Sequence, residues 1–275
     1  MSLSNLTASL PPFLTRPRSL LATLTATLST TLLLISAVRD YRAYIALGPG
    51  GVPHNLAGWL FVTLAIRPFA LPQASATATA DYPSEGAHED ILDLPPRKGE
   101  RATLGGIVPH RQLTQHAPEK MREFIQNLYA NAATQNPSIL EQKRSLYERH
   151  NPALFVSSDL LKNPPSSSDP LPETARVARG EISHPHADLS IHIYLSPADA
   201  KIAIDRGWAE RHRLSLPRSS WFANRYHVAD SYLMIYGPRD EEEMEVLAVF
   251  LRNAVRFMTG REDVEAIVWR HRLEA

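Results

Sequence analysis

The sequence predicts an α+β fold: a single domain with a mixed or antiparallel sheet and packed helices, preceded by one N-terminal transmembrane helix. Three observations predict it. An uncharged stretch near the N-terminus is long enough to cross a bilayer. Further along, alternating strand-like segments and longer helical patterns follow one another without a regular strand–helix–strand repeat. The length of 275 residues suits one domain and an anchor.

The anchor is expected over residues 19–38, after a short tail at 1–18. It reads SLLATLTATLSTTLLLISAV and contains no charge, Pro or Gly. About 20 residues at a rise of about 1.5 Å span the roughly 30 Å of a bilayer core. A signal peptide has a shorter apolar core, and a mitochondrial targeting peptide carries Arg along its length. These alternatives fit less well, and we expect a single-pass protein of an endomembrane such as the endoplasmic reticulum.

The domain is expected over residues 39–275. Its first apolar stretch, 56–70, is too short to span a bilayer, so it is either a core helix or a helix in the membrane interface. Residues 72–90 and 162–176 are small, polar or proline-rich, and we expect them to be flexible.

Apolar periodicity and capping residues predict the regular elements of the domain. The stretch SIHIYL at 190–195 alternates strictly, as a half-buried strand does. Acidic residues open the helix predicted at 240–258, and Gly260 ends it. Helices are predicted over 118–128, 137–149, 197–207 and 240–258, and strands over 153–157, 190–195 and 232–236.

Composition excludes several functional classes. Lys plus Arg and Asp plus Glu number 29 each, so no basic field attracts nucleic acid. The chain has no cysteine, which excludes disulfides, thiolate metal ligands and thiol nucleophiles. No nucleotide-binding, α/β-hydrolase or zincin motif occurs.

The richest chemistry lies in residues 180–212. Side chains alternate along a strand, so Ser190, His192 and Tyr194 share one face of the predicted strand. His184 and His186 point the same way if their segment is extended. Three interpretations stay open: an exposed polar sheet face, a metal-free active site that uses imidazole as a base, and a histidine metal site.

Two further groups are candidates for binding. Trp208, Glu210, Arg211 and His212 follow the end of a predicted helix, and Tyr236 and Arg239 lie where a strand gives way to a helix. The alternative for Trp208 is a place in the core. The alternative for Arg239 is an ion pair with the acidic residues at 241–243.

Several motifs carry a resemblance to a known family. These are Arg39-Asp40-Tyr41, Gly48-Pro49, LPPRKG at 94–99, His110-Arg111-Gln112, EISHPH at 181–186, Ser190-Ile191-His192, GWAERH at 207–212 and YGPRDEEE at 236–243. In these motifs and their order the chain resembles the fungal luciferases, membrane-associated enzymes that oxidise 3-hydroxyhispidin with O2. Two segments, 73–88 and 221–227, depart from the family pattern and put the substrate in question.

The resemblance implies a cofactor-independent oxygenase that acts on a hispidin-type pyrone or a related small apolar enol, with O2 as co-substrate. It implies a small-molecule substrate and a membrane as partners, and neither a metal nor a nucleic acid. The catalytic candidates are His184, His186, His192, Glu210 and Arg239. The substrate-binding candidates are Glu181, Tyr194, Trp208, Arg211, His212 and Tyr236. We expect the histidines to converge with Arg239 and Trp208 on one enclosed hollow.

Two rival functions remain. One is a metalloenzyme whose ligands are His184, His186 and His192. The other is a non-catalytic membrane protein that binds a small apolar ligand in the same pocket.

Overall fold

The computed structural model describes residues 17–163, 171–217 and 219–274. The chain separates into two compact units, one up to Ala46 and one from Leu47 onward. The predicted tail therefore lies mostly outside the described residues, and so does the middle of the loop predicted at 162–176.

Helix α1 (Pro17–Ala46) contains the predicted anchor. By length and composition it could cross a membrane. It continues beyond residue 38 through Arg39, Asp40 and Arg42, because neither Pro nor Gly interrupts the chain before Gly48, whose φ is +76°.

Among the described residues, the second unit holds all the strands and the remaining helices. Its helical elements are α2 (Leu56–Phe61), the π-helical turn η3 (Val62–Ile66), the 3-10 turns η4 (Arg67–Phe69) and η5 (Gln73–Ser75), α3 (Glu89–Leu92), α4 (Met121–Gln135), α5 (Ser158–Lys162), α6 (Glu173–Val177), α7 (Pro197–Asp205), α8 (Trp221–Tyr226) and α9 (Glu241–Thr259). Its strands are β1 (Leu104–Gly106), β2 (His110–Gln112), β3 (Leu140–Arg144), β4 (Pro152–Val156), β5 (Glu181–Pro185), β6 (Ile191–Tyr194), β7 (Ala209–Arg211) and β8 (Tyr232–Ile235).

All strand pairs are antiparallel. Six strands form one sheet in the order β3-β4-β5-β6-β8-β7, and β1 and β2 form a separate hairpin. The structure therefore confirms the α+β class, with an antiparallel sheet.

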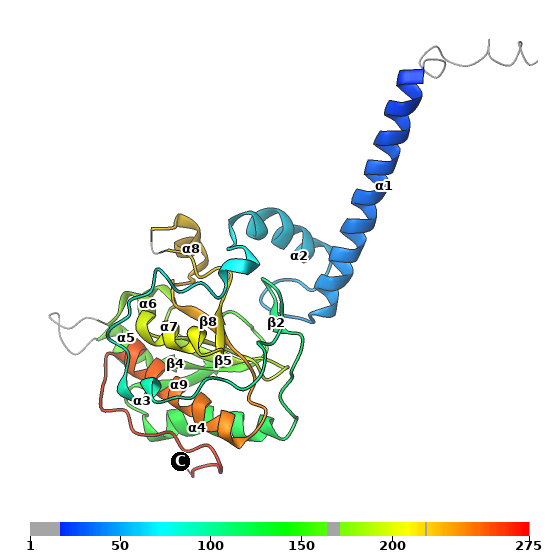
Figure 1. Ribbon diagram of the computed structural model, residues 1–275. Coiled ribbons are helices and arrows are strands. Elements are labelled where there is room, and N and C mark those ends of the chain that lie inside the picture. The colour runs from blue at the N-terminus through cyan, green and yellow to red at the C-terminus, as the bar shows by residue number, and fades with distance from the viewer. Residues whose placement is uncertain (1–16, 164–170, 218, 275) are drawn as a thin grey trace, which may run out of the picture. The chain divides into compact units, whose positions relative to one another are not determined.

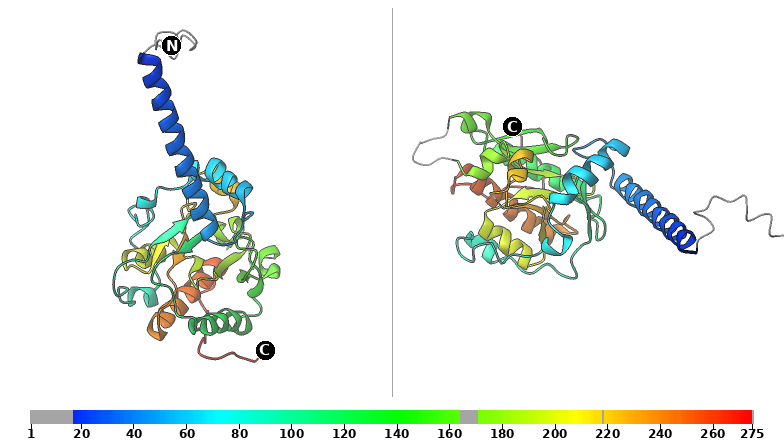
Figure 2. Two further views of the ribbon diagram at one scale, coloured as in Figure 1. Left: turned by 90° about the vertical axis from the view of Figure 1, so that its right-hand side faces the viewer. Right: turned by 90° about the horizontal axis from the view of Figure 1, so that it is seen from above.

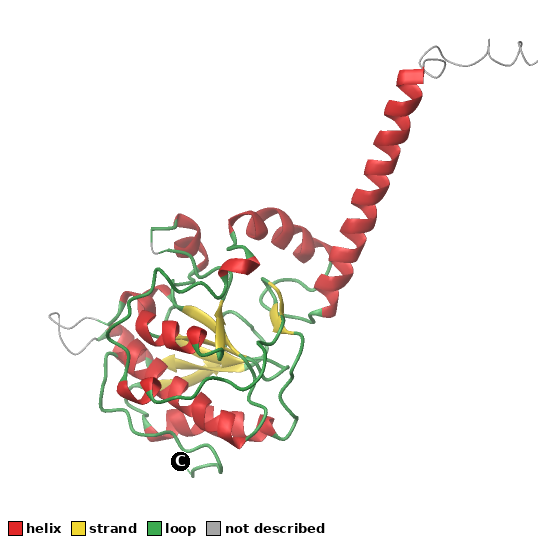
Figure 3. Cartoon of the chain, viewed as in Figure 1, coloured by secondary structure: helices red, strands yellow, loops and turns green. Residues whose placement is uncertain are grey.

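Helices cover one face of the six-stranded sheet. Helices α4 and α9 pack against β3 to β6, and α7 packs against β7. Figure 1 and the secondary-structure colouring of Figure 3 show α4 and α9 on one side of the strands, and the left view of Figure 2 shows both at the lower side of the domain. The hydroxyls of Tyr129 on α4 and Ser183 on β5 share a short hydrogen bond, so the face of Ser183 and of its cross-strand partner Ile193 meets the helices. The next pair along the two strands, His184 and His192, faces the opposite way.

Most predicted elements are present with shifted ends, but one is wrong. The helix predicted over 137–149 is the edge strand β3 followed by a turn. Leu140 pairs with Val156 and Arg144 with Pro152, and this pairing overrides the helical preference of the polar run between them. Residues 72–90 contain the short turn η5, and Ala76 and Tyr82 of this segment are buried.

Candidate active site

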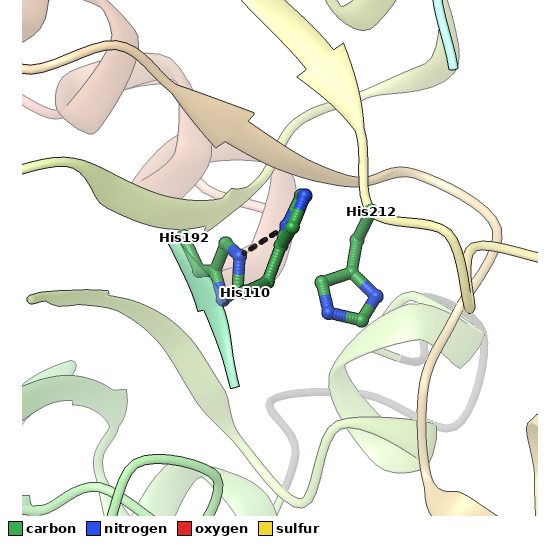
Figure 4. A group of neighbouring side chains, drawn as sticks. All are labelled: His110, His192 and His212. Atoms are coloured by element: carbon green, nitrogen blue, oxygen red, sulfur yellow. Dashed lines mark hydrogen bonds between the residues drawn. The ribbon is translucent and has the colours of Figure 1, made fainter. Parts of the chain in front are cut away.

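Five buried histidines gather on the sheet face opposite the helices. His184 on β5 pairs directly with His192 on β6, and His186 follows β5. His212, just after β7, and His110 on β2 complete the group. All five residues are at most 5% exposed. Ring centroids of neighbouring histidines lie 4.5–5.5 Å apart. Figure 4 shows three of them, His110, His192 and His212, each from a different segment.

An extra residue in β5 decides which side chain faces this cluster. Leu154 pairs with Ser183, but the next residue, Phe155, pairs with Glu181, so Ile182 is unmatched in the ladder. Residues three apart on a regular strand face opposite ways, and one bulged residue brings them to the same face. The bulge at Ile182 therefore puts Glu181 on the histidine face of the sheet.

Glu181 holds His184 in place there. Its Oε1 lies 2.7 Å from Nδ1 of His184, and both side chains are 1% exposed. The Ser145 hydroxyl and the Leu146 N–H also donate to this carboxylate at 2.7 Å each. A carboxylate on Nδ1 favours the tautomer that carries the proton on that nitrogen, so Nε2 becomes the acceptor.

His186 is oriented by a separate chain of hydrogen bonds. Its Nδ1 lies 2.9 Å from the Ser190 hydroxyl, and that hydroxyl donates to Asp188 at 2.6 Å. The Nε2 atoms of His186 and His110 have no hydrogen-bond partner among the described residues. His110 Nδ1 lies 3.3 Å from His192 Nε2, as the dashed line in Figure 4 marks.

Burial keeps four of these imidazoles neutral. It lowers the pKa of His110, His186 and His192 well below the ordinary value, and neighbouring cationic or imidazole groups lower each pKa further. Burial lowers the pKa of His212 to about 3. Neutral imidazoles offer lone pairs as well as N–H donors, which suits proton transfer or metal ligation.

The cluster forms part of the wall of a cavity of about 310 Å³. His110, His184, His192 and His212 line it, whereas His186 lies behind them. Apolar side chains form much of the remaining wall: Phe61, Ile66, Ile107, Leu214, Tyr226 and Val228. This is the composition of a small-molecule site, with an apolar lining and a few converging polar groups.

Three tyrosines extend the polar group. Tyr147 and Tyr232 line the cavity, and Tyr194 stacks on Tyr232 with ring centroids 4.5 Å apart. The hydroxyls of Tyr147 and Tyr194 lie 3.0 Å apart, and the Tyr232 hydroxyl has no partner among the described residues. Burial raises the pKa of each, so all three stay protonated at neutral pH.

One ion pair lies at the cavity. Arg111 and Glu148 both line it, both are buried, and they form a short hydrogen bond to each other. Arg111 also donates to the carbonyl oxygen of Pro49 at 2.7 Å. Burial raises the pKa of Glu148, and the Arg111 charge opposes that shift.

Five of the predicted site residues lie elsewhere. Tyr236 donates to Glu210 at 2.6 Å, and Met234, which pairs with both His192 and Glu210, packs with Ala102, Leu104 and Tyr236. Met234 therefore lies between His192 and the Glu210–Tyr236 pair.

The other three are held by separate contacts. Trp208 is buried, donates to the Pro95 carbonyl at 2.7 Å and meets the Phe250 ring of α9, as its core alternative predicts. Arg211 pairs with Asp81, and Arg239 pairs with Glu243. The expectation that Arg239 and Trp208 share one hollow with the histidines is therefore wrong.

Among the buried polar residues of the cavity wall, sequence reasoning did not select His110, Arg111, Tyr147, Glu148 and Tyr232 as site candidates. The motif His110-Arg111-Gln112 was the one available signal for the first two. The tyrosines lie in segments without a motif, and only the fold brings them to the histidines.

The histidines also form two potential metal-binding triads that share His192. His110, His192 and His212 make one, and His184, His186 and His192 make the other. The ligand atoms of each triad lie within 4.8 Å of one another. Ligand nitrogens around a tetrahedral zinc ion would be about 3.4 Å apart, so the rings could reach that geometry with small shifts.

Comparisons with known proteins agree with the sequence resemblance. The family model described as Luciferase domain matches residues 179–254, which contain β5 to most of α9. Proteins named luciferase from Neonothopanus nambi, Armillaria gallica and Armillaria mellea are 26%, 27% and 28% identical to this chain. Each alignment covers 81% of this chain and 81% of the relative. No solved structure matches the chain.

Proposed function

The chain belongs to the fungal luciferase family, and we propose on that premise that it oxidises a hispidin-type pyrone, or a related small apolar enol, with O2 in the histidine cavity. One observation carries this proposal: the carboxylate-bound His184 and the neutral imidazoles of His110, His192 and His212 line one apolar cavity, and all but His110 lie in the matched segment. Pockets for small molecules usually measure about 300–1,000 Å³, so about 310 Å³ suits a compact ligand.

His184 is the best-placed general base. Glu181 on Nδ1 fixes the ring and would stabilise the imidazolium that forms when Nε2 takes a proton. His192, the other base candidate, has no carboxylate partner, and burial lowers its pKa. We therefore assign proton removal from the substrate hydroxyl to His184 and a positioning role to Glu181.

Neutral donors and one buried, ion-paired arginine line the cavity where this step creates charge. His192 and His212 can donate N–H groups to an enolate or peroxide oxygen, and Arg111 supplies a positive charge at the same cavity. In the proposed reaction the enolate passes electrons to O2, a carbon–oxygen bond forms, and the peroxide collapses with loss of CO2. The substrate itself supplies the electrons, so the proposal includes no bound cofactor. The apolar wall excludes water.

The test supplies 3-hydroxyhispidin to the purified full chain and follows O2 uptake, CO2 release and light together. We expect O2 and CO2 in equal amounts, and a fall of about 10²- to 10⁴-fold in turnover for His184→Gln, the range for loss of a general base. His116→Gln is the matched control, because His116 is exposed and does not line the cavity. Substrate binding without O2 uptake would favour the non-catalytic alternative. Parent activity in His184→Gln would contradict the base assignment.

A metal-dependent oxygenase is the second candidate, because the two histidine triads have ligand atoms within 4.8 Å. Elemental analysis of the purified chain separates the two mechanisms. A stoichiometric metal whose removal abolishes O2 uptake would replace the cofactor-free proposal.

We also propose that α1 crosses a membrane once, in an endomembrane such as the endoplasmic reticulum, because it is long and apolar enough to do so. Mass spectrometry of the N-terminus and alkaline extraction of membranes test this. An N-terminus beyond residue 38 would identify a cleaved signal peptide instead.

A further inference from the structure

A patch of large apolar side chains is exposed on the domain. Within the described part of the domain, six such residues belong to the helical segment from α2 to η4 or to α8: Leu56, Leu60, Phe61, Leu64, Phe69 and Trp221. Leu64 is 70% exposed and Trp221 65%. Exposed apolar residues scattered singly are ordinary, but a contiguous patch marks an interaction surface.

The patch is built by the fold from two distant segments. The Phe69 ring stacks on Phe222 at 4.8 Å and meets Trp221 edge-on at 5.5 Å, and Phe61 lies 6.5 Å from Tyr226. Figure 1 shows α2 and α8 at the same end of the domain.

Helix α2 and the turn after it divide into two stripes. Leu56, Leu60 and Leu64 recur every four residues and are exposed. Gly58, Val62 and Ile66 recur with the same spacing and are buried against the domain. The helix is therefore already packed on one side, and its apolar outer side is left without a partner in the described chain.

The charges on the two segments that build the patch have one sign. Residues 41–80 and 211–229 contain no Asp or Glu, although the whole chain has equal numbers of acidic and basic residues. Arg67 and Arg225 are exposed beside the apolar side chains. Burial lowers the pKa of Arg213, and the nearby charge of Arg67 lowers it further. Cations around an apolar surface complement a bilayer with anionic headgroups.

We propose that this patch docks on the lipid surface of an anionic membrane, with the side chains of Leu60, Leu64 and Trp221 among the headgroups. The connection to α1 favours a membrane over a soluble partner. Residues 47–55 link α1 to α2, and an extended chain advances about 3.5 Å per residue. An inserted α1 would therefore keep the beginning of α2 within about 35 Å of the bilayer.

Docking would also bring the cavity to the membrane. Phe61 and Tyr226 belong both to the rim of the patch and to the cavity wall, and Ile66 lies on the inner stripe of the same helical segment. An apolar ligand dissolved in the bilayer would then reach the histidines without crossing water. This delivery route rests on the proposed function, whereas the docking does not.

Site-directed spin labelling of the full chain in vesicles tests the docking. The chain has no cysteine, so Leu64→Cys and Trp221→Cys each give one labelling site, and the exposed Leu92→Cys on α3 is the matched control. We expect labels at 64 and 221 to be accessible to O2, which concentrates in lipid, and protected from a water-soluble nickel complex. The label at 92 should show the reverse. Unchanged thermal unfolding of each variant shows that the label leaves the fold intact.

Vesicles of phosphatidylcholine with and without phosphatidylserine test the charge complementarity. Deeper burial of the labels with phosphatidylserine, reduced by Arg67→Glu, supports the proposal. Labels at 64 and 221 as exposed to the nickel complex as the label at 92 would overturn it. Protection from both reagents with spin–spin broadening would also overturn it, because a second copy of the chain would then cover the patch. None of these outcomes depends on turnover, so failure of the docking and failure of the proposed reaction are distinguishable.

Discussion

The buried histidines should make the domain unusually sensitive to mild acid. The pKa of His110, His186, His192 and His212 is lowered by burial, whereas in the unfolded chain each has a pKa of about 6.5. Below that pH the unfolded state binds protons that the folded state does not. Stability therefore rises with pH and is lost as the pH falls through about 6.5.

The size of the loss follows from proton linkage. Each imidazole held neutral costs up to about 1.4 kcal/mol per pH unit once the unfolded form is protonated, so four of them cost about 5 kcal/mol between pH 7 and 5.5. Three groups act in the opposite direction. The hydrogen bond that His88 donates to the Asp199 carboxylate raises the pKa of His88, and burial raises the pKa of Glu148 and Glu210. The net loss should be about 3–5 kcal/mol, a large share of the 5–15 kcal/mol that stabilises a typical domain.

Guanidinium unfolding of the full chain in detergent measures this loss. Trp208 and Trp269 are both buried and report on the domain by fluorescence. We expect the midpoint to fall steeply from pH 7 to pH 5.5, and to fall less in His212→Asn, whose amide oxygen can still accept from the Leu214 N–H. His116→Asn, an exposed control, should keep the parent slope. An unfolding free energy that stays constant over this range would refute the conclusion that the buried cluster is neutral.

Three substitutions test the cavity wall. Arg111→Met leaves Glu148 buried and unpaired and should cost about 3–5 kcal/mol of unfolding free energy. Adding Glu148→Gln should restore part of this loss, and a double-mutant cycle measures the coupling between the two residues. Gly51→Ala places a Cβ 2.2 Å from the Tyr147 carbonyl oxygen, so it should lower the unfolding free energy by about 1–3 kcal/mol and raise KM. If thermal unfolding and kinetics are unchanged, the backbone at Gly51 moves without cost. Glu181→Gln removes one of two acceptor oxygens and should lower the unfolding free energy by about 1–3 kcal/mol. We expect kcat to fall by a larger factor than KM rises, and kinetics equal to those of the parent would exclude Glu181 from the mechanism.

Local pattern predicted the centre of the fold. The alternation in SIHIYL is the alternation of β6, whose His192 and Tyr194 face the cluster while Ile193 faces the helices. The acidic first turn, the apolar stripe and Gly260 predicted α9 almost to its ends. In both cases the residues themselves carry the period that the element needs.

Nonlocal geometry explains what could not be predicted. His110 lies 82 residues before His192, and only the docking of the β1–β2 hairpin brings their rings together. Glu210 does share the face of His192, but Met234 stands between them, and alternation alone does not show which part of a face a cavity occupies. The edge strand β3 could not be predicted because its polar side chains do not alternate as those of a strand do. Its extended conformation follows from its pairing with β4.

The unmatched Ile182 ties the register of β5 to the chemistry of the site. If Ile182 instead paired with Phe155 in a regular ladder, the Glu181 carboxylate would turn toward the apolar helices, where an unpaired anion is costly to bury. A homologue with two residues between the acid and the imidazole therefore keeps their contact only if it keeps the bulge. A homologue with a single residue between them would place both on one face of a regular strand.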